Sequence, residues 1–201
     1  MKRIILILPY WGTFPNYFQL FLDSCGKNPT IDWLIMTDDL SPYSYPKNVR
    51  RQYCDFPTFR AKVQKAFDFE LTYAATPYKM CSIRTIWGYA MPDVIAGYDY
   101  WGFCDCDMIF GDIRSFFPDS LLARYDRLLA RGHLTLYRNA EDINVAFMQM
   151  STDTKYYWRR VLSLPENAPV VCFDEWGGTS RLWKSQRRDR FYDEIIFDDI
   201  N

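Results

Sequence analysis

The sequence predicts an α/β fold with a mostly parallel central sheet and helices on both faces. Short apolar runs alternate with stretches whose apolar residues recur at helical spacing. Three of the runs end in polar or aromatic clusters, at 9–12, 37–39 and 105–107, as strands do beside a ligand cleft. A chain of 201 residues can bury one well-packed core, so we expect a single domain over 1–201.

The first part of the chain supplies two strands and a helix. Residues 3–8 form an apolar run closed by Pro9, which predicts a central strand. Residues 14–25 carry apolar side chains at helical spacing and stop at Gly26, as a helix does. A second strand is predicted at 31–36, before a loop rich in Pro and Tyr at 41–46.

The later elements follow the same alternation. Helical spacing predicts helices at 58–70 and 79–96. The apolar run 98–104 predicts a strand that leads into the acidic residues at 105–107. The remaining predictions are a strand at 133–137, a helix at 155–164, a helix or turn at 174–185, and a short last strand at 195–197.

Asp105 and Asp107 are the most informative residues. Side chains two apart on a strand point to the same face, which would turn Cys106 into the core. Two such carboxylates can hold one hard divalent ion from one side and leave its other positions to water and phosphate oxygens. The spacing therefore predicts Mg²⁺ or Mn²⁺ with a bound diphosphate. An acidic turn is the simpler alternative. An EF-hand is excluded because Phe110 stands where its loop needs glycine.

Composition excludes several other classes. A net charge of −1 does not favour nucleic acid, and an apolar content of 49% is too high for a disordered chain. No apolar run approaches the ~20 residues of a membrane helix, so we expect no transmembrane segment. The six cysteines show no CxxC and no framework spacing, which predicts reduced thiols and a cytoplasmic protein.

The order of these blocks resembles the GT-A type glycosyltransferases, which carry a D-x-D motif at a strand end. The likeness rests on 9–12, 37–39, the helix through 78–84, and 105–107 followed by 109–113. More narrowly, 14–18, 131–139 and 172–178 look like a little-studied bacterial family found near polysaccharide-biosynthesis genes. The resemblance covers nearly the whole chain. D-x-D alone is a weak motif, and its spacing from the other blocks gives it weight.

The resemblance implies a Rossmann-like GT-A fold and a metal-dependent transfer of a sugar from a nucleotide-sugar donor, a UDP-sugar by preference. The acceptor would be a glycan or a lipid-linked molecule in surface polysaccharide synthesis. Family members continue past 196–200, so we expect a chain shortened at its C-terminus. In GT-A enzymes the C-terminal part often supplies a further metal ligand, commonly His.

Site roles follow for several further residues, each with an alternative. Pro9, Tyr10 and Trp11 could border the nucleotide and stack on its base, or pack in the core. Asp38 and Asp39 could accept hydrogen bonds from uracil or ribose, or they could cap a helix or brace a turn.

Two further pairs of residues carry charge near the predicted cleft. Lys79 and Arg84 could face the donor phosphates, although a spacing of five places at most one of them there. Asp174 and Glu175 could hold the acceptor or act as base, or they could open a helix. The sole histidine, His133, is expected to be a hydrogen-bonded core group more than a ligand.

The basic stretch 181–190 could touch anionic lipid headgroups at the inner face of the membrane, although a solvated helix face balanced by the following acids is favoured. Two other functions stay open. The chain could be a non-catalytic nucleotide- or glycan-binding domain of GT-A shape, or a metal-dependent phosphoryl-transfer or hydrolytic enzyme.

Overall fold

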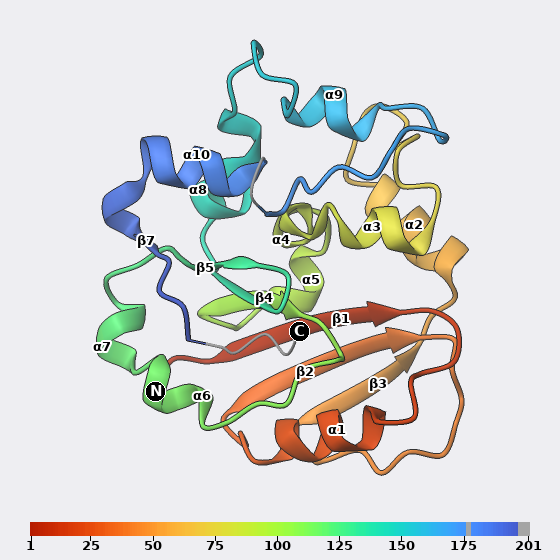
Figure 1. Ribbon diagram of the computed structural model, residues 1–201, viewed down its shortest axis with the longest axis vertical. Coiled ribbons are helices and arrows are strands. Elements are labelled where there is room, and N and C mark those ends of the chain that lie inside the picture. Colours follow the sequence, from red (N-terminus) through yellow and green to blue (C-terminus); the bar gives the residue numbers. More distant parts are fainter. Residues whose placement is uncertain (176–177, 197–201) are drawn as a thin grey trace.

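The computed structural model describes residues 1–175 and 178–196. Within these ranges seven strands form one mixed sheet, in the order β3-β2-β1-β4-β6-β5-β7 (Figure 1). The strands are β1 (Ile4–Tyr10), β2 (Ile31–Thr37), β3 (Val49–Tyr53), β4 (Tyr100–Cys104), β5 (Arg127–Arg131), β6 (Leu134–Arg138) and β7 (Phe191–Tyr192). The predicted α/β fold with a mostly parallel sheet is confirmed at this level, since four of the six pairings are parallel.

The order in which strands are added to the sheet reverses beside β1. From β1 the chain first builds β2 and β3 on one side, and it then returns to place β4 on the other side. Both neighbours of β1 run parallel to it, with Tyr10 opposite Thr37 and Ile7 opposite Phe103. The carboxyl ends of β1, β2 and β4 therefore meet at one edge, with the switch point of the sheet between β1 and β4. We call this margin the carboxyl edge.

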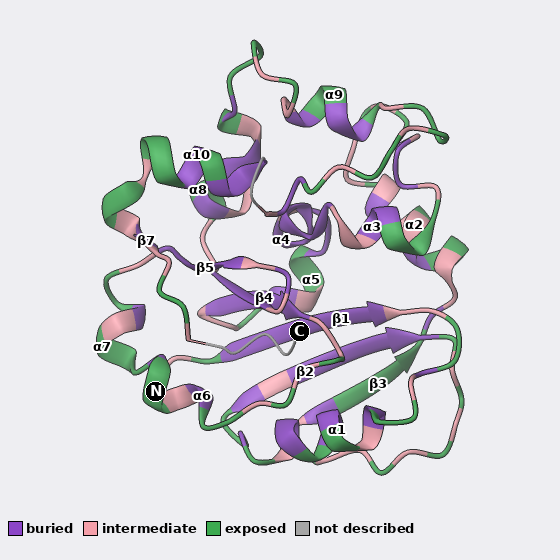
Figure 2. Ribbon diagram, in the orientation of Figure 1, coloured by how far each residue is buried: buried purple, intermediate pink, exposed green. Residues whose placement is uncertain are grey.

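The central strands are buried on both faces, as Figure 2 shows for β1, β2 and β4. Along β1 the side chains alternate between two apolar layers, with Ile5 and Ile7 on one face and Ile4, Leu6 and Leu8 on the other. This explains why β1 reads as a continuous apolar run. Helices α1, α6 and α7 cover the second face, and the other helices cover the first.

The helices are shorter than predicted. They are α1 (Phe18–Gly26), α2 (Phe56–Gln64), α3 (Pro77–Cys81), α4 (Trp87–Ala90), α5 (Pro92–Ile95), α6 (Ile113–Phe116), α7 (Asp119–Leu122), α8 (Glu141–Asn144), α9 (Trp158–Leu162) and α10 (Thr179–Gln186), with 3₁₀ turns η1 (Arg84–Ile86), η2 (Ala146–Gln149) and η3 (Arg188–Arg190). The single helix expected at 79–96 is thus broken into four pieces. Met91 leaves the helical region before Pro92, as residues before proline do.

The helix expected at 58–70 begins and ends earlier, as α2. It begins after Asp55, whose side chain accepts the Thr58 N–H at 2.8 Å. It ends at Gln64, whose amide closes the following loop by binding both Phe69 O (2.7 Å) and Leu71 N (2.8 Å).

Three strands were missed or misplaced by the sequence. β3 is an edge strand exposed at four of its five residues, so it lacks the apolar alternation that marks a half-buried strand. β5 begins with the buried, charged Arg127. The strand expected at 195–197 is wrong for 195 and 196, which lie outside any strand, while 197 lies outside the described residues; β7 pairs at 191–192 instead.

β5 contains a β-bulge. Its register against β6 shifts between Leu128 and Arg131, and Leu129 takes φ of 65°. A left-handed backbone is strained for leucine. Leu128 and Leu129 consequently both face the α1 side, and Ala130 faces the other side.

Two findings concern the classes considered above. In the described ranges, no helix has both the length and the apolar content needed to cross a bilayer. All six cysteines are free thiols, as predicted.

Gly88 in α4 should not tolerate a side chain. An added methyl group would overlap the Trp101 ring, which is fully buried and held by an Nε1–Asn144 hydrogen bond of 2.7 Å. We expect Gly88→Ala to lower the free energy of unfolding by about 2 kcal/mol in urea titration. Gly111→Ala, where nothing lies within 4 Å, should change it by less than about 0.5 kcal/mol. Equal effects would mean that this contact does not limit packing.

Candidate functional site

The acidic segment leaves the sheet at the carboxyl edge. β4 ends at Cys104, and the Asp105 N–H donates to His133 O at 3.4 Å, at the start of β6. Asp105 and Asp107 therefore lie in a bend beyond the strand, and the expectation that they share one strand face is wrong. Cys106 is half-buried and packs against the α1-side layer, and burial raises the pKa of its thiol to about 12.

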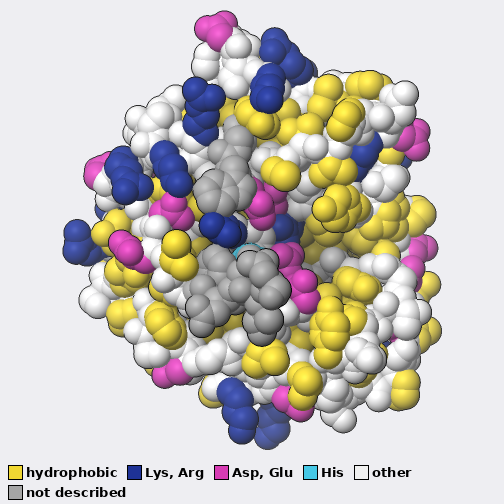
Figure 3. Space-filling model, viewed as in Figure 1, with side chains coloured by type: hydrophobic (Ala, Val, Ile, Leu, Met, Phe, Trp, Pro, Cys, Tyr) yellow, Lys and Arg dark blue, Asp and Glu magenta, His cyan; other side chains and the backbone are white. Residues whose placement is uncertain are grey.

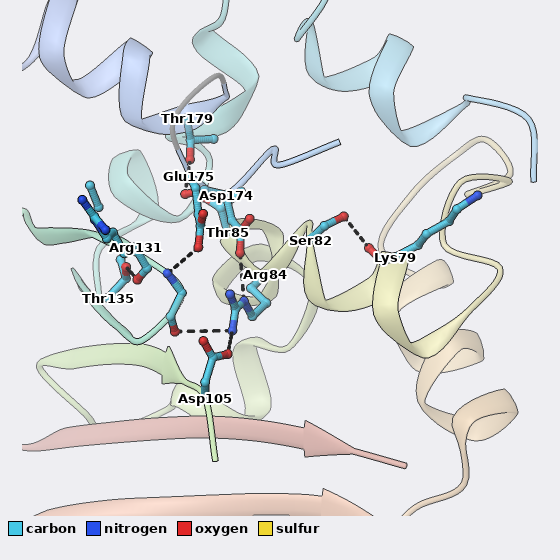
Figure 4. A network of polar contacts seen from close by, with 12 residues as sticks. Lys79, Ser82, Arg84, Thr85, Asp105, Arg131, Thr135, Asp174, Glu175 and Thr179 are labelled. Atoms are coloured by element: carbon cyan, nitrogen blue, oxygen red, sulfur yellow. Dashed lines mark hydrogen bonds and ion pairs between the residues drawn. The ribbon is translucent and has the colours of Figure 1, made fainter. Parts of the chain in front are cut away.

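Arg84 joins two carboxylates that are distant in sequence. Its Nη1 donates to Asp105 Oδ1 at 2.6 Å, and its Nε donates to Asp174 Oδ2 at 2.8 Å (Figure 4). The guanidinium carbon lies 4.5 Å from the centre of the Phe103 ring. Burial alone would lower the pKa of Arg84, but the two carboxylates outweigh it and raise the pKa further. The arginine is thus fixed in its charged form.

Asp174 and Asp105 differ in exposure. The Asp174 side chain is 3% exposed and the Asp105 side chain 36% exposed. Burial raises the pKa of Asp174, and the Arg84 guanidinium opposes this effect. Asp174 therefore serves as a buried anchor for Arg84, while Asp105 reaches the surface.

Gly132 lies at the centre of the cluster. Its N–H donates to Glu175 Oε1 at 2.6 Å, and its carbonyl accepts from Arg84 Nη1 at 3.4 Å. A methyl group there would overlap Arg84 Nη2 and lie 2.8 Å from Glu175 Oε1 and 3.1 Å from Asp105 Oδ2. The absence of a side chain lets these three charged groups converge. Gly132 was not singled out in the sequence; the turn signal Arg131-Gly132 between two apolar runs was its available clue.

Arg127 holds the turn that carries Asp174 and Glu175 from the protein interior. This side chain is fully buried and packs against the rings of Tyr137 and Phe191, each 5.2 Å from its guanidinium carbon. Its Nη2 donates to Asp174 O (3.0 Å) and Ser180 Oγ (2.9 Å). Burial lowers the pKa of Arg127. Nothing in the sequence marked it, because it is a single charge at the start of a strand.

Asp107 differs from Asp105. It is exposed, and its carboxylate makes neither a hydrogen bond nor an ion pair with the described part of the chain. The ring of Tyr17 lies near enough for Asp107 to help raise the pKa of the tyrosine, after the effect of burial. In residues 1–175 and 178–196, no three His, Cys, Asp or Glu side chains gather as metal ligands. Two carboxylates would leave most positions of a divalent ion to other oxygens, so a metal here would need a ligand that supplies them.

Lys79 points away from this cluster (Figure 4). Its ammonium donates to the Glu166 carbonyl and lies 5.3 Å from the centre of the Tyr73 ring. Of the two basic residues, only Arg84 contacts the acidic segment; whether either faces donor phosphates stays a prediction.

Tyr10, at the end of β1, closes a column of stacked rings. It packs on Phe14 at 4.5 Å and 19°, Phe14 on Phe18 at 3.7 Å and 6°, and Phe18 on Phe21 at 5.5 Å and 19°. Trp11, which follows Pro9 and Tyr10, turns its ring edge toward Phe56 and Phe59 and donates its Nε1–H to Cys54 O at 2.9 Å.

Asp38 and Asp39 hold the loop after β1. Asp38 Oδ1 accepts the Gly12 N–H at 2.9 Å, and Asp39 Oδ2 accepts the Phe14 N–H at 2.8 Å. Hydrogen bonding from Ser41 and from Phe14 lowers the pKa of Asp39. Both residues thus brace a turn, as the alternative interpretation expected. Asp38 uses one carboxylate oxygen for this, and Asp39 uses both.

The surface around the cluster carries both signs of charge. Figure 3 shows acidic and basic side chains meeting near the middle of one face, with hydrophobic side chains beside them. The basic stretch 181–190 is in part balanced, with Lys184 2.8 Å from Asp193 and Arg190 2.8 Å from Asp126. This supports the solvated helix face that was favoured.

The chain belongs to DUF6625, a family of unknown function whose model matches residues 6–201. The match includes every residue of the cluster around Arg84. Among curated proteins, none matches the chain.

The two carboxylates on Arg84 should contribute unequally to stability. We expect Asp174→Asn to lower the free energy of unfolding by about 3 kcal/mol, because it removes the buried partner of a buried cation. Asp105→Asn should cost about 1 kcal/mol, since its carboxylate is one-third exposed. Urea unfolding of both variants tests the difference, and equal losses would show that Asp174 is not the anchor.

Proposed function

We propose that the protein is a metal-dependent glycosyltransferase of GT-A type that uses a nucleotide-sugar donor, UDP-sugar by preference. One observation carries the proposal: Asp105 and Asp107, the first of them bonded to a charged arginine, follow β4 next to the switch point between the parallel strands β1 and β4. Open α/β sheets bind nucleotides at this position. The acceptor in this proposal is a glycan or a lipid-linked molecule.

The aromatic column supports a base-binding role for Tyr10. Phe14 covers one face of the Tyr10 ring, and no other described ring stacks on the opposite face. A planar base could extend the column at the carboxyl edge. Trp11 is directed into the layer around Phe59, so it packs there and leaves the stacking role to Tyr10. Asp38 is positioned near the same loop, and one of its oxygens holds Gly12 N.

The diphosphate would lie between Asp107 and Arg84. A divalent ion held by Asp107, with Asp105, would neutralise the charge that develops on the leaving diphosphate. Arg84 offers guanidinium donors to the same oxygens, and its attachment to Asp174 fixes their direction. These roles agree with an oxocarbenium-like transition state, in which little covalent chemistry is asked of the protein.

Glu175 is the carboxylate left for the acceptor. Asp174 is buried on Arg84 and cannot reach an incoming hydroxyl from that position. Glu175 is half-buried, and one of its oxygens holds Gly132 N at 2.6 Å. In this proposal Glu175 orients the acceptor or accepts its proton, and Asp174 acts by positioning Arg84. Because the donor is a cytoplasmic metabolite, the proposal places the reaction in the cytoplasm or at the inner membrane face.

A non-catalytic nucleotide- or glycan-binding domain is the second candidate. The observation that favours it is that the described residues bring no three metal-ligating side chains together. It predicts binding without turnover. Incubation with several UDP-sugars, followed by mass spectrometry for released UDP, distinguishes the two, because only the enzyme releases UDP.

Asp107 should control the metal dependence of nucleotide binding. We expect isothermal titration to show UDP binding at least about tenfold tighter with Mn²⁺ than without it. Asp107→Ala should abolish this difference and shift the melting temperature by less than about 2 °C, since the side chain is exposed. Asp189→Ala is the matched control, because η3 precedes β7 at the opposite edge of the sheet. UDP binding that ignores Mn²⁺ would contradict the proposal.

Tyr10 should contribute to base binding. Stacking of a base on an aromatic side chain is worth about 1–3 kcal/mol, so Tyr10→Ala should weaken UDP binding by about tenfold or more. Tyr78→Ala, which removes an exposed ring from α3, should leave the affinity within about twofold. Titration of UDP against both variants measures this, and an equal loss would remove Tyr10 from the site.

A further inference from the structure

The carboxylate of Asp105 is turned toward the protein. Its Oδ1 accepts the short bond from Arg84 Nη1, and its Oδ2 faces Gly132, where an added methyl group would lie 3.1 Å away. Figure 4 shows this carboxylate directed at Arg84. Charge-assisted bonds of 2.6 Å are among the strong ones in proteins. In this arrangement Asp105 already has a cation.

Arg84 cannot easily leave that position. Its side chain is 10% exposed, its Nε is held by the buried Asp174, and its plane lies over Phe103. A divalent ion bound to Asp105 would therefore lie beside a fixed positive charge. Repulsion between the two cations opposes binding. The carboxylates of Asp174 and Glu175 offset it only in part, because one is already bonded to Arg84 and the other to the Gly132 N–H. A diphosphate would relieve it, because its oxygens can bind both cations at once.

We propose that Arg84 is an internal counter-ion that keeps Asp105 from binding divalent cations until a diphosphate is present. The metal and the nucleotide then bind as one unit, with Asp107 as the freely available protein ligand. This inference rests on the proposed function for its ligand. It adds an order of binding and a role for Arg84 that opposes metal affinity in the empty site while favouring diphosphate.

The first test uses the unaltered protein and needs no variant. Equilibrium dialysis with Mn²⁺ measures the metal retained with the protein alone, with uridine and with UDP. We expect weak retention alone and with uridine, and an apparent affinity at least about tenfold higher with UDP. Equally tight Mn²⁺ binding without UDP would overturn the inference. No UDP binding under any condition would instead overturn the proposed function.

The second test removes the internal cation without leaving a buried unpaired charge. Arg84→Gln combined with Asp174→Asn replaces the buried ion pair by two neutral amides and frees Asp105. We expect this double variant to bind Mn²⁺ alone at least about tenfold more tightly than the unaltered protein, measured by loss of the free Mn²⁺ signal in electron paramagnetic resonance. Adding Asp105→Asn should reverse the gain.

Two controls keep this test readable. Arg138→Gln with Asp126→Asn removes an ion pair of 2.6 Å at the opposite edge, and should leave Mn²⁺ binding unchanged. Arg84→Lys keeps the charge and should keep Mn²⁺ binding weak, even if the double variant fails to fold. Unchanged Mn²⁺ affinity in a folded double variant, or tight binding by Arg84→Lys, would overturn the inference. Because this readout needs no nucleotide, it stays informative if UDP does not bind.

Discussion

The pairing of one buried guanidinium with two carboxylates organises the carboxyl edge. Removing a charge from water is costly unless an opposite charge and hydrogen bonds replace the solvent. Arg84 meets this requirement with Asp174 inside and Asp105 at the surface, and the carbonyl of Gly132 adds a weaker contact. Segments that are 21 and 90 residues away along the chain are thereby set against the same group. The positions of the acidic side chains follow from this pairing more than from the strand that precedes them.

The broken helix at 77–95 makes the pairing possible. In a continuous helix, residues five apart diverge by a fixed angle along one axis. Here α3 ends at Cys81 and η1 begins at Arg84, so the two basic side chains are oriented independently. Lys79 holds the segment around Glu166, and Arg84 enters the cluster. The pieces stay together because each buries apolar side chains, among them Met80, Ile86 and Trp87, in one shared layer.

The sequence was informative where apolar periodicity is strong. The apolar runs at β1, β2, β4 and β6 predicted strands, the first of them central, and the polar residues after three of them predicted the edge where the cluster lies. It was uninformative where charge is buried. Arg127 and Asp174 look like surface residues because their partners are a backbone carbonyl and an arginine far along the chain. Pairing over such distances leaves no local pattern. β3 was missed for the opposite reason, since its exposed edge needs no apolar alternation.

Because of the bulge at Leu129, the number of residues in β5 decides which way the residues after it face. Beyond it the side-chain alternation of the strand is inverted, and the hairpin turn reaches the cluster with the Gly132 amide directed at Glu175. A strand one residue shorter would restore ordinary alternation and rotate that amide to the opposite face, with no residue identity changed. Insertions and deletions in this hairpin should therefore be more damaging than most replacements. The strained backbone of Leu129 accompanies this inverted alternation.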